Sequence, residues 1–283
     1  MNAIRHAAGW RSCFPALADY DDNAVSVIED GWDFQIVRVD DVGVRVPRRG
    51  EVEKHARVEA RMLPELARRL PVQVPAPQEF CEVHGSMIYA WIPGHPASDR
   101  IVDAVGAETL AVQLAAFVSA LHRFPPERAR EHGVADGRLL DQVDRFDAHV
   151  LPLLANKREP ERLLAQAREH LGSYEPRLVH GDLGPAHLLC DDQGLAAVID
   201  WTDLALGDPA QDATWILNGL DQRLRAPFLA ALPLDDDLVA RADIIHRLGP
   251  WWEVLYGLEQ QRPGFVESGM AGIEERLRSA VEE

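Results

Sequence analysis

The chain has 283 residues, which is enough for one large domain or for two lobes that share a cleft. Hydrophobic residues make up 47% of it and charged residues 27%, a composition that excludes a disordered or fibrous protein. The formal net charge of −17 argues against nucleic acid and anionic membranes as partners, because phosphate groups attract clusters of lysine and arginine.

Cysteine usage and the amino terminus indicate the compartment. Cys13, Cys81 and Cys190 are scattered and odd in number, so we expect neither a disulfide framework nor a zinc site. Residues 1–14 lack the continuous apolar stretch of a signal peptide, and no run of about 18 apolar residues occurs. We therefore expect a soluble protein in the reducing cytoplasm.

The first third of the chain predicts a small antiparallel sheet with one helix. Apolar and polar side chains alternate over residues 24–46, and residues 80–92 form two more strands around a turn. Between them, apolar residues recur at helical spacing from Val52 to Leu70, and this helix should end before Pro71.

A break near residue 92 divides the chain. Residues 92–96 contain two prolines and a glycine that stop regular structure, so we place residues 1–92 in one lobe and residues 93–283 in another. Helical periodicity dominates the second lobe, over residues 109–123, 137–155, 159–171 and from 210 to the end. Helix boundaries or first turns are expected at Pro227, Pro233, Pro250 and Pro263. The fold class is therefore α+β.

One segment of the helical lobe departs from the helical period. The run LVHGDLGPAHLLCDDQGLAAVIDW, residues 178–201, predicts a loop, a short strand at 188–190, a turn, and a second strand at 196–199. Polar residues gather beside these short strands, which makes the segment the strongest candidate for a functional site.

Three residues of this segment have the spacing of a kinase catalytic loop and its metal-binding aspartate. Asp182 and His187 lie five positions apart, and Asp200 follows thirteen later at a strand end. Phosphoryl transfer needs a carboxylate that accepts the proton of an attacking hydroxyl, and ligands that hold magnesium on the nucleotide phosphates. An isolated Asp-Leu-Gly-Pro is usually only a turn, but the whole set in this order favours catalysis.

The same residues carry a resemblance to a known family. HGDLGPAHLL followed by VIDWTDLALGDPAQD resembles the signature of the aminoglycoside phosphotransferase superfamily, and the WTD is especially similar to macrolide 2′-phosphotransferases. The likeness extends from about residue 31 to residue 272. It implies a bilobal, protein kinase-like fold with a small nucleotide-binding lobe at 1–92, an antiparallel sheet plus one helix. The larger, mainly helical lobe at 93–283 would hold catalysis and substrate.

The resemblance also implies an activity and a role for each polar residue of the segment. Relatives use ATP or GTP with Mg²⁺ to phosphorylate a hydroxyl of an antibiotic, which confers resistance. Asp182 matches the catalytic aspartate, and His187 and Asp200 match the two metal ligands. The residues implied to brace the loop are His180, Asp208 and, one helical turn later, Asp212.

The nucleotide site departs from the usual kinase pattern. Arg45 stands where kinases have a strand lysine, and Glu59 on the following helix is its expected partner. A glycine-rich G-x-G-x-x-G loop is absent, and only Gly31 occurs in the first turn. Nucleotide recognition should then rest on backbone groups there and at the hinge, where we single out Tyr89, Trp91 and Ile92.

Several alternatives stay open on the sequence alone. The acceptor could be a macrolide, an aminoglycoside, another antibiotic or a small metabolite, because fold does not fix substrate. Arg45 in place of lysine and histidine at position 187 also suit a catalytically inactive nucleotide-binding homologue. Arg45 could have its head in water, Glu59 could be a solvated helix charge, and His187 could be a hydrogen-bonded core histidine.

The last third contains aromatic and acidic clusters of open meaning. Trp251, Trp252 and Tyr256 could line a substrate pocket, but adjacent helix residues face different ways, so at least one should pack elsewhere. Residues 235–237 read as a solvated acidic loop. From Trp201 onward the sequence contains fifteen Asp and Glu, seven Arg and no Lys. This excess of acidic residues suits either plain solvation or an acidic cleft for an amine-bearing antibiotic.

Overall fold

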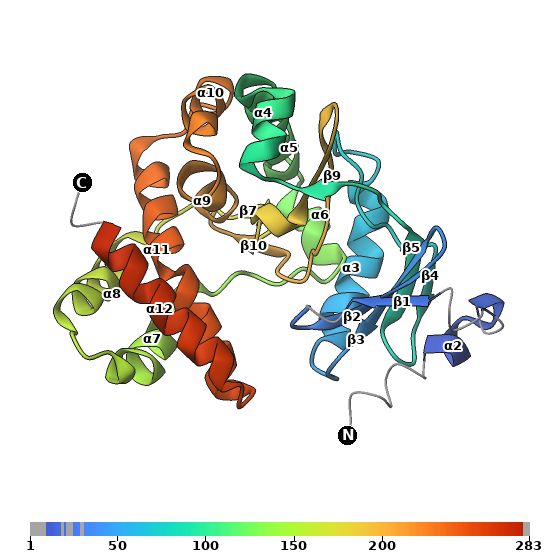
Figure 1. The fold of residues 1–283 in the computed structure, drawn as a ribbon, viewed down its shortest axis with the longest axis horizontal. Coiled ribbons are helices and arrows are strands. Elements are labelled where there is room, and N and C mark those ends of the chain that lie inside the picture. Colours follow the sequence, from blue (N-terminus) through green and yellow to red (C-terminus); the bar gives the residue numbers. More distant parts are fainter. Residues whose placement is uncertain (1–9, 18–19, 21–24, 29–30, 280–283) are drawn as a thin grey trace.

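The structure, a computed structural model, describes residues 10–17, 20, 25–28 and 31–279. A small sheet with few helices lies at one side of the molecule, and a larger, mainly helical part lies at the other (Figure 1). We call the first the sheet lobe and the second the helical lobe. The predicted combination of an antiparallel sheet lobe and a helical lobe is confirmed.

The sheet lobe is built on five antiparallel strands in the order β1-β2-β3-β5-β4. The strands are β1 (Val25–Ile28), β2 (Phe34–Val39), β3 (Val42–Pro47), β4 (Glu79–Cys81) and β5 (Ser86–Ala90). They fall within the two segments whose side chains alternate, because a period of two sends successive side chains to opposite faces. Ala24, the predicted start of the first segment, lies outside the described residues.

Both faces of this sheet are covered. On one face, the helical turns α2 (Trp10–Cys13) and η1 (Pro15–Leu17) bring three apolar residues onto β2, β3 and β5. These residues are Trp10, Phe14 and Leu17. On the other face lies α3 (Glu53–Leu66), whose Ala56 packs with Phe34 and Met87. Since α2 and η1 are so short, periodicity did not predict them.

Helix α3 is shorter than predicted and joins both lobes. It ends at Leu66 instead of Leu70, and it contains Pro64, which has no N–H to donate to the preceding turn. Its second half carries Met62, Leu63 and Leu66, and all three belong to the core of the helical lobe. The helix therefore fixes the sheet lobe to the rest of the molecule.

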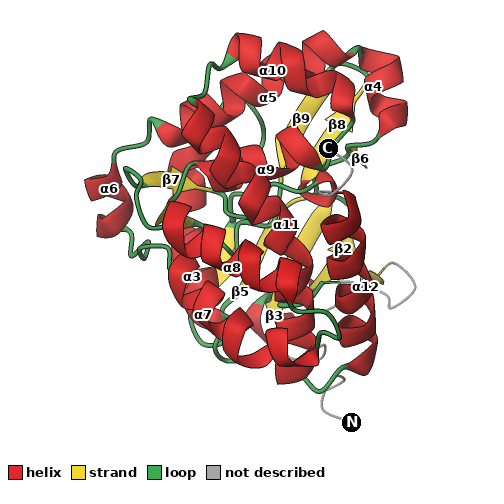
Figure 2. Ribbon diagram, turned by 90° about the vertical axis from the view of Figure 1, so that its left-hand side faces the viewer, coloured by secondary structure: helices red, strands yellow, loops and turns green. Residues whose placement is uncertain are grey.

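The helical lobe surrounds two small sheets (Figures 1 and 2). Its helices are α4 (Asp99–Val105), α5 (Ala107–His122), α6 (Pro126–Glu131), α7 (Leu139–His149), α8 (Arg158–His170), α9 (Ala210–Asn218), α10 (Arg225–Ala231), α11 (Asp236–Glu259) and α12 (Pro263–Ser279), with short 3-10 turns η3 (Leu151–Leu153), η4 (Pro185–His187) and η5 (Gln222–Leu224). One sheet has the order β6-β8-β9, from β6 (His95–Pro96), β8 (Leu188–Asp191) and β9 (Gly194–Val198). The other pairs β7 (Arg177–Val179) with β10 (Ala205–Gly207).

Several local predictions need correction. The segment 92–96 does not simply stop regular structure, because His95 and Pro96 form β6 against β8. Pro250 lies inside the 24-residue helix α11 instead of at a boundary. Asp235 is not part of a solvated loop, because its side chain accepts the N–H of Leu238 at 2.7 Å and caps α11. Of the helix expected over 137–155, only Leu139–His149 forms an α-helix, α7, and the short turn η3 follows it.

The helical lobe has a continuous apolar core through which α5 runs. Its residues Leu110, Leu114, Phe117 and Val118 are at most 1% exposed. Within the described residues, no single helix has the length and apolarity to cross a membrane, and α4 and α5 meet that test only as a pair bent by 105°.

Two valines on α5 allow a test of how burial stabilises this core. Val118 is 1% exposed and Val112 is 49% exposed. Val118→Ala should lower the free energy of unfolding by about 2 kcal/mol, because it removes buried methyl groups and leaves a cavity. Val112→Ala should change it by less than about 0.5 kcal/mol. Urea denaturation of both variants measures this, and equal losses would contradict the placement of α5.

Candidate functional site

The short strands of the helical lobe bring the predicted site residues together. β7 leads into the loop 180–187, and the β8–β9 hairpin returns the chain beside it. The N–H of Ile199 donates to the carbonyl of His187 at 3.0 Å, which puts Asp200 next to the loop. Asp182, His187 and Asp200 therefore face one another, although Asp182 and His187 belong to the loop 180–187 and Asp200 follows β9.

The loop is held by a buried aspartate and a buried histidine. The Asp212 carboxylate on α9 accepts the N–H groups of His180 at 3.1 Å and of Gly181 at 3.0 Å. The His180 ring donates from Nε2 to the carbonyl of Ile199 at 3.0 Å, and its Nδ1 accepts the N–H of Asp182 at 3.3 Å. Burial lowers the pKa of His180, which favours this neutral form.

Asp208 supports the loop indirectly, through the helix α9. Its carboxylate accepts Nε of Arg241 on α11 at 2.8 Å and the N–H of Ala210 at 3.0 Å. The second of these bonds joins Asp208 to Ala210, the first residue of α9, which is the helix that carries Asp212. Asp208 thus supports the helix, and Asp212 makes the contacts to the loop.

Gly181 lets two backbone segments approach closely. Its φ is +88°, and a Cβ at this position would lie 2.5 Å from the carbonyl oxygen of Asp203. Asp200 in the facing segment also has a positive φ of 61°, which is costly for a residue with a side chain. The backbone here is fixed in a conformation that the local sequence alone would not favour.

The geometry of His187 and Asp200 leaves two lone pairs facing each other. The Nδ1 of His187 lies 2.7 Å from the carbonyl of Asp182 and must donate to it, so in the neutral ring Nε2 carries no hydrogen. This Nε2 lies 3.8 Å from Oδ2 of Asp200. Two acceptors that face each other across this gap suit a cation held between them. The Asp182 side chain, 48% exposed, lies at the edge of this pair.

Arg45 on β3 connects the sheet lobe to this site. One of its amino groups is bonded to Glu59 on α3, and the other lies 2.6 Å from both Oδ1 of Asp200 and Oγ1 of Thr202. Its guanidinium also lies over the Phe34 ring, 3.7 Å from the centroid. Arg45 is 5% exposed and Glu59 is 1% exposed. Neither charged group is in water, so the two solvated alternatives that the sequence left open are wrong.

The network around Arg45 shifts the pKa of both carboxylates. Burial raises the pKa of Glu59, because it disfavours the charged form more than the neighbouring guanidinium restores it. Burial would also raise the pKa of Asp200, but the charge of Arg45, together with the hydroxyl that Thr202 donates, outweighs it and lowers this pKa to about 2. Asp200 therefore stays ionised, with Oδ1 held by Arg45 and Oδ2 turned to His187.

Sequence reasoning missed two neighbours of Asp200. Thr202 donates its hydroxyl to Oδ1 of Asp200 at 2.7 Å. The pKa of Asp203 is raised to about 7, because desolvation by the surrounding chain and the charges of Asp182, Asp200 and Asp33 favour its protonated form, although the residue keeps an exposed surface. The WTD motif was the available signal. Its Trp201 is fully buried and packs edge-on against His180.

Comparison with known proteins agrees with this geometry. Residues 24–244 match the profile of the phosphotransferase enzyme family. The chain belongs to this family. The viomycin phosphotransferase of Streptomyces vinaceus is 28% identical over 156 residues, which are 51% of this chain and 53% of that protein. The match covers 53% of the viomycin phosphotransferase and 66% of a second curated relative, an uncharacterised protein of Bacillus subtilis. The chain therefore matches less than two thirds of either relative.

Solved structures of family members extend the likeness to the whole fold. The macrolide 2′-phosphotransferase MphH of Brachybacterium faecium is 27% identical, with a TM-score of 0.72 over 93% of this chain and 98% of that one. The GDP and kanamycin complex of APH(2")-IIIa is 23% identical, with a TM-score of 0.84 over 98% of this chain and 99% of that one. The bilobal kinase-like fold expected for the phosphotransferase family is thus confirmed.

The predicted hinge contains one backbone donor already in use. The ring of Tyr89 is buried over Gly43, where an added Cβ would lie 2.5 Å from it. The N–H of Trp91 donates to the carbonyl of Asp41 at 2.7 Å. In the described part of the chain, the N–H of Ile92 has no backbone partner, although the residue is only 9% exposed. Ile92 is therefore the hinge residue with an open donor.

The three aromatic residues of α11 have different environments. Trp251 is fully buried against Phe146, and the half-buried Trp252 packs edge-on against the same ring. Tyr256 instead reaches the sheet lobe, where its ring stacks on Trp32 with centroids 4.3 Å apart. The turn that replaces the glycine-rich loop is thus in contact with the helical lobe.

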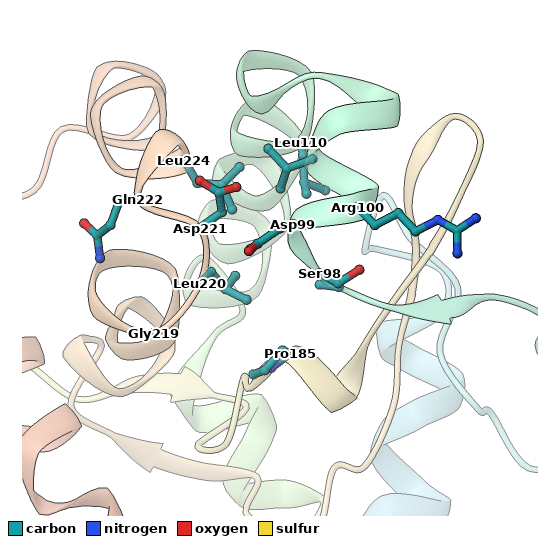
Figure 3. Close-up of a pocket in the computed structure, with 12 residues that line it drawn as sticks. Ser98, Asp99, Arg100, Leu110, Pro185, Gly219, Leu220, Asp221, Gln222 and Leu224 are labelled. Atoms are coloured by element: carbon teal, nitrogen blue, oxygen red, sulfur yellow. The ribbon is translucent and has the colours of Figure 1, made fainter. Parts of the chain in front are cut away.

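A pocket of about 740 Å³ lies beside the loop at Pro185 (Figure 3). Its lining includes Pro185 of the loop, Ser98 and Asp99 at the start of α4, and Leu220 and Asp221 before η5. Asp182 is not among the lining residues, so this pocket is separate from the exposed carboxylate.

Removing one partner of the Arg45–Glu59 pair should destabilise the fold more than removing both partners. Glu59→Leu should cost about 3–5 kcal/mol, because it leaves a buried guanidinium short of a partner. Combining it with Arg45→Met should recover most of that loss, because the buried charge is then removed. Urea denaturation of the single and double variants measures the coupling. A single variant as stable as the parent chain would contradict the buried pair.

Asp203 should make stability fall with rising pH. A folded-state pKa of about 7, above the usual 3.8, means that the folded chain binds more protons between these values, so ionisation of Asp203 destabilises the fold as pH rises. Asp203→Asn should therefore gain stability over the parent from pH 5 to about pH 7, after which the difference levels off. Urea denaturation across this range measures it. The matched change Asp192→Asn, at an exposed turn, should give no such trend.

Proposed function

We propose that this protein is a nucleotide-dependent O-phosphotransferase that transfers the γ-phosphoryl group of ATP or GTP to a hydroxyl of an antibiotic. The observation that carries the proposal is the facing pair of His187 Nε2 and Asp200 Oδ2 beside the half-exposed carboxylate of Asp182. Phosphoryl transfer needs such a combination of a cation site and a base. The sheet lobe, residues 1–92, would bind nucleotide, and residues 93–283 would hold catalysis and substrate.

The residues present fit a divalent cation. His187 and Asp200 would hold Mg²⁺, which supplies charge neutralisation at the nucleotide phosphates. Imidazole is an uncommon ligand for Mg²⁺, but the Nδ1 bond to the Asp182 carbonyl orients this ring in the way that metal-binding histidines require.

Arg45 takes the place of the kinase lysine. Its guanidinium could grip phosphate oxygens, but one amino group already serves Glu59 and the other serves Asp200 and Thr202. A nucleotide phosphate must therefore share the second amino group. The open N–H of Ile92, with Tyr89 and Trp91 around it, is the candidate contact for the base of the nucleotide.

Asp182 would orient the acceptor hydroxyl and accept its proton during in-line transfer. Its backbone is fixed by His180 and its side chain is exposed, so the carboxylate can reach a bound acceptor. The carboxylates of Asp182, Asp200 and Asp33 lie close together around Asp203, which favours an acceptor that carries an amine. Relatives named for viomycin and for macrolides, and one solved in complex with kanamycin, support an antibiotic as acceptor. The cytoplasm, where nucleotides are abundant, would be the site of action.

A substrate panel tests the proposal. The chain is incubated with Mg²⁺, ATP or GTP, and macrolide, aminoglycoside, peptide or nucleoside antibiotics, and products are weighed by mass spectrometry. We expect a gain of about 80 Da, one phosphoryl unit, on one class. A gain on none of them, with nucleotide still bound, would favour a metabolite kinase or an inactive homologue.

Asp182→Asn tests the base. It should lower kcat by about 10²–10⁴-fold, because general-base catalysis contributes about that much, while nucleotide binding is retained. Steady-state kinetics on the antibiotic identified by the panel measures it, with Asp192→Asn as the matched exposed control. Equal activity of the two variants would remove Asp182 from the mechanism.

A further inference from the structure

Two cysteines and a histidine from distant parts of the chain meet at the outer end of the sheet lobe. Sγ of Cys13 lies 3.6 Å from Nδ1 of His84, and Sγ of Cys81 lies 3.8 Å from the same atom. The three atoms are all within 4.8 Å of one another. Cysteine spacing did not predict this cluster, because 71 positions separate Cys13 from His84.

The local backbone presents two of these groups together. Cys81 ends β4 and His84 lies in the turn before β5, so they form a C-x-x-H sequence on one tight hairpin. The N–H of Gly85 donates to the carbonyl of Cys81 at 2.8 Å, and Gly85 has a φ of +66° that few other residues would adopt. This turn directs the Cys81 thiol and the His84 ring to the same side.

The third group comes from the amino-terminal helical turn. Cys13 is the last residue of α2, whose Trp10 is buried against the sheet together with Phe14. Figure 1 shows α2 at the end of the sheet lobe that points away from the helical lobe. The cluster is therefore remote from Asp182 and serves no step of phosphoryl transfer.

The distances fit a tetrahedral metal centre. With Zn–S bonds of about 2.3 Å and Zn–N bonds of about 2.0–2.1 Å, tetrahedral geometry separates sulfur from nitrogen by about 3.6 Å. The two measured separations, 3.6 Å and 3.8 Å, are close to this value. Both cysteines are half-buried and His84 is exposed, so a fourth position would open to water.

We propose that Cys13, Cys81 and His84 form a binding site for Zn²⁺. Two thiolates and one imidazole are ligands that Zn²⁺ prefers, whereas Mg²⁺ prefers oxygen, so this site and the one at Asp200 select different ions. Binding replaces the two thiol protons, which pass to solvent, and no oxidant or reductant takes part. A water molecule completes the coordination.

The bound ion would fasten the amino-terminal segment to the sheet. Trp10, Phe14 and Leu17 cover one face of β2 and β3, so these short turns are packed on the sheet through their apolar side chains. A metal bridge between α2 and the β4–β5 hairpin closes a long loop of chain, and a ligand that binds only the folded state stabilises it. The ion is thus structural and not catalytic.

Metal content tests the proposal. The full chain, without a histidine tag, is purified with a non-thiol reductant, incubated with one equivalent of Zn²⁺, desalted and measured by elemental mass spectrometry. We expect one zinc per chain in the parent and in Cys190→Ser, a matched control because Cys190 has no histidine partner in the described structure. Cys13→Ser and Cys81→Ser should lose the zinc.

Two further measurements make the result decisive. His84→Ala should weaken zinc binding at least about tenfold, and because this side chain is exposed, the variant should fold even if a cysteine variant does not. Co²⁺ in place of Zn²⁺ should give a thiolate charge-transfer band in the parent that both cysteine variants lose. A parent chain without zinc, equal zinc in His84→Ala, or a Cys13–Cys81 disulfide formed in place of zinc binding would each overturn the proposal.

Discussion

One buried cation connects the two lobes of this protein at the candidate site. The guanidinium of Arg45 joins β3, α3 and the segment after β9. Without it, Glu59 and Asp200 would be two carboxylates with no cation between them. With it, Asp200 is kept ionised and its orientation is set, so the same group links the sheet lobe to the proposed metal ligands. His55 on α3 adds a second link, to the carbonyl of Thr202 at 2.9 Å.

The site concentrates negative charge that its own residues do not fully neutralise. Asp182, Asp200 and Asp203 lie together, and in the described part of the chain only Asp200 among them is bonded to an arginine. Desolvation is the main cause of the raised pKa of Asp203, and the neighbouring carboxylates add to it. A magnesium ion would relieve it when nucleotide binds, and an amine on the acceptor would relieve it further. Each cation that enters the site is attracted by the same carboxylates.

Features that depend on residues close together in the sequence could be predicted, whereas features that depend on contacts between distant residues could not. The sheet strands follow local alternation, and Asp182 and Asp200 are only eighteen positions apart, so both could be predicted. The partners of Arg45 lie 155 and 157 positions away at Asp200 and Thr202, and no periodicity reveals them. The strands β6, β7 and β10 have two or three residues, too few for a pattern. Cys13 and His84 meet only after the chain has folded.

The stack of Trp32 on Tyr256 ties the sheet lobe to α11. The Tyr256 hydroxyl adds to this contact, because it donates to the carbonyl of Trp32 at 3.3 Å. An aromatic pair is worth about 0.5–1.5 kcal/mol. Any opening of the sheet lobe away from α11 must first break this contact, so two aromatic rings set part of the free energy that holds the lobes closed.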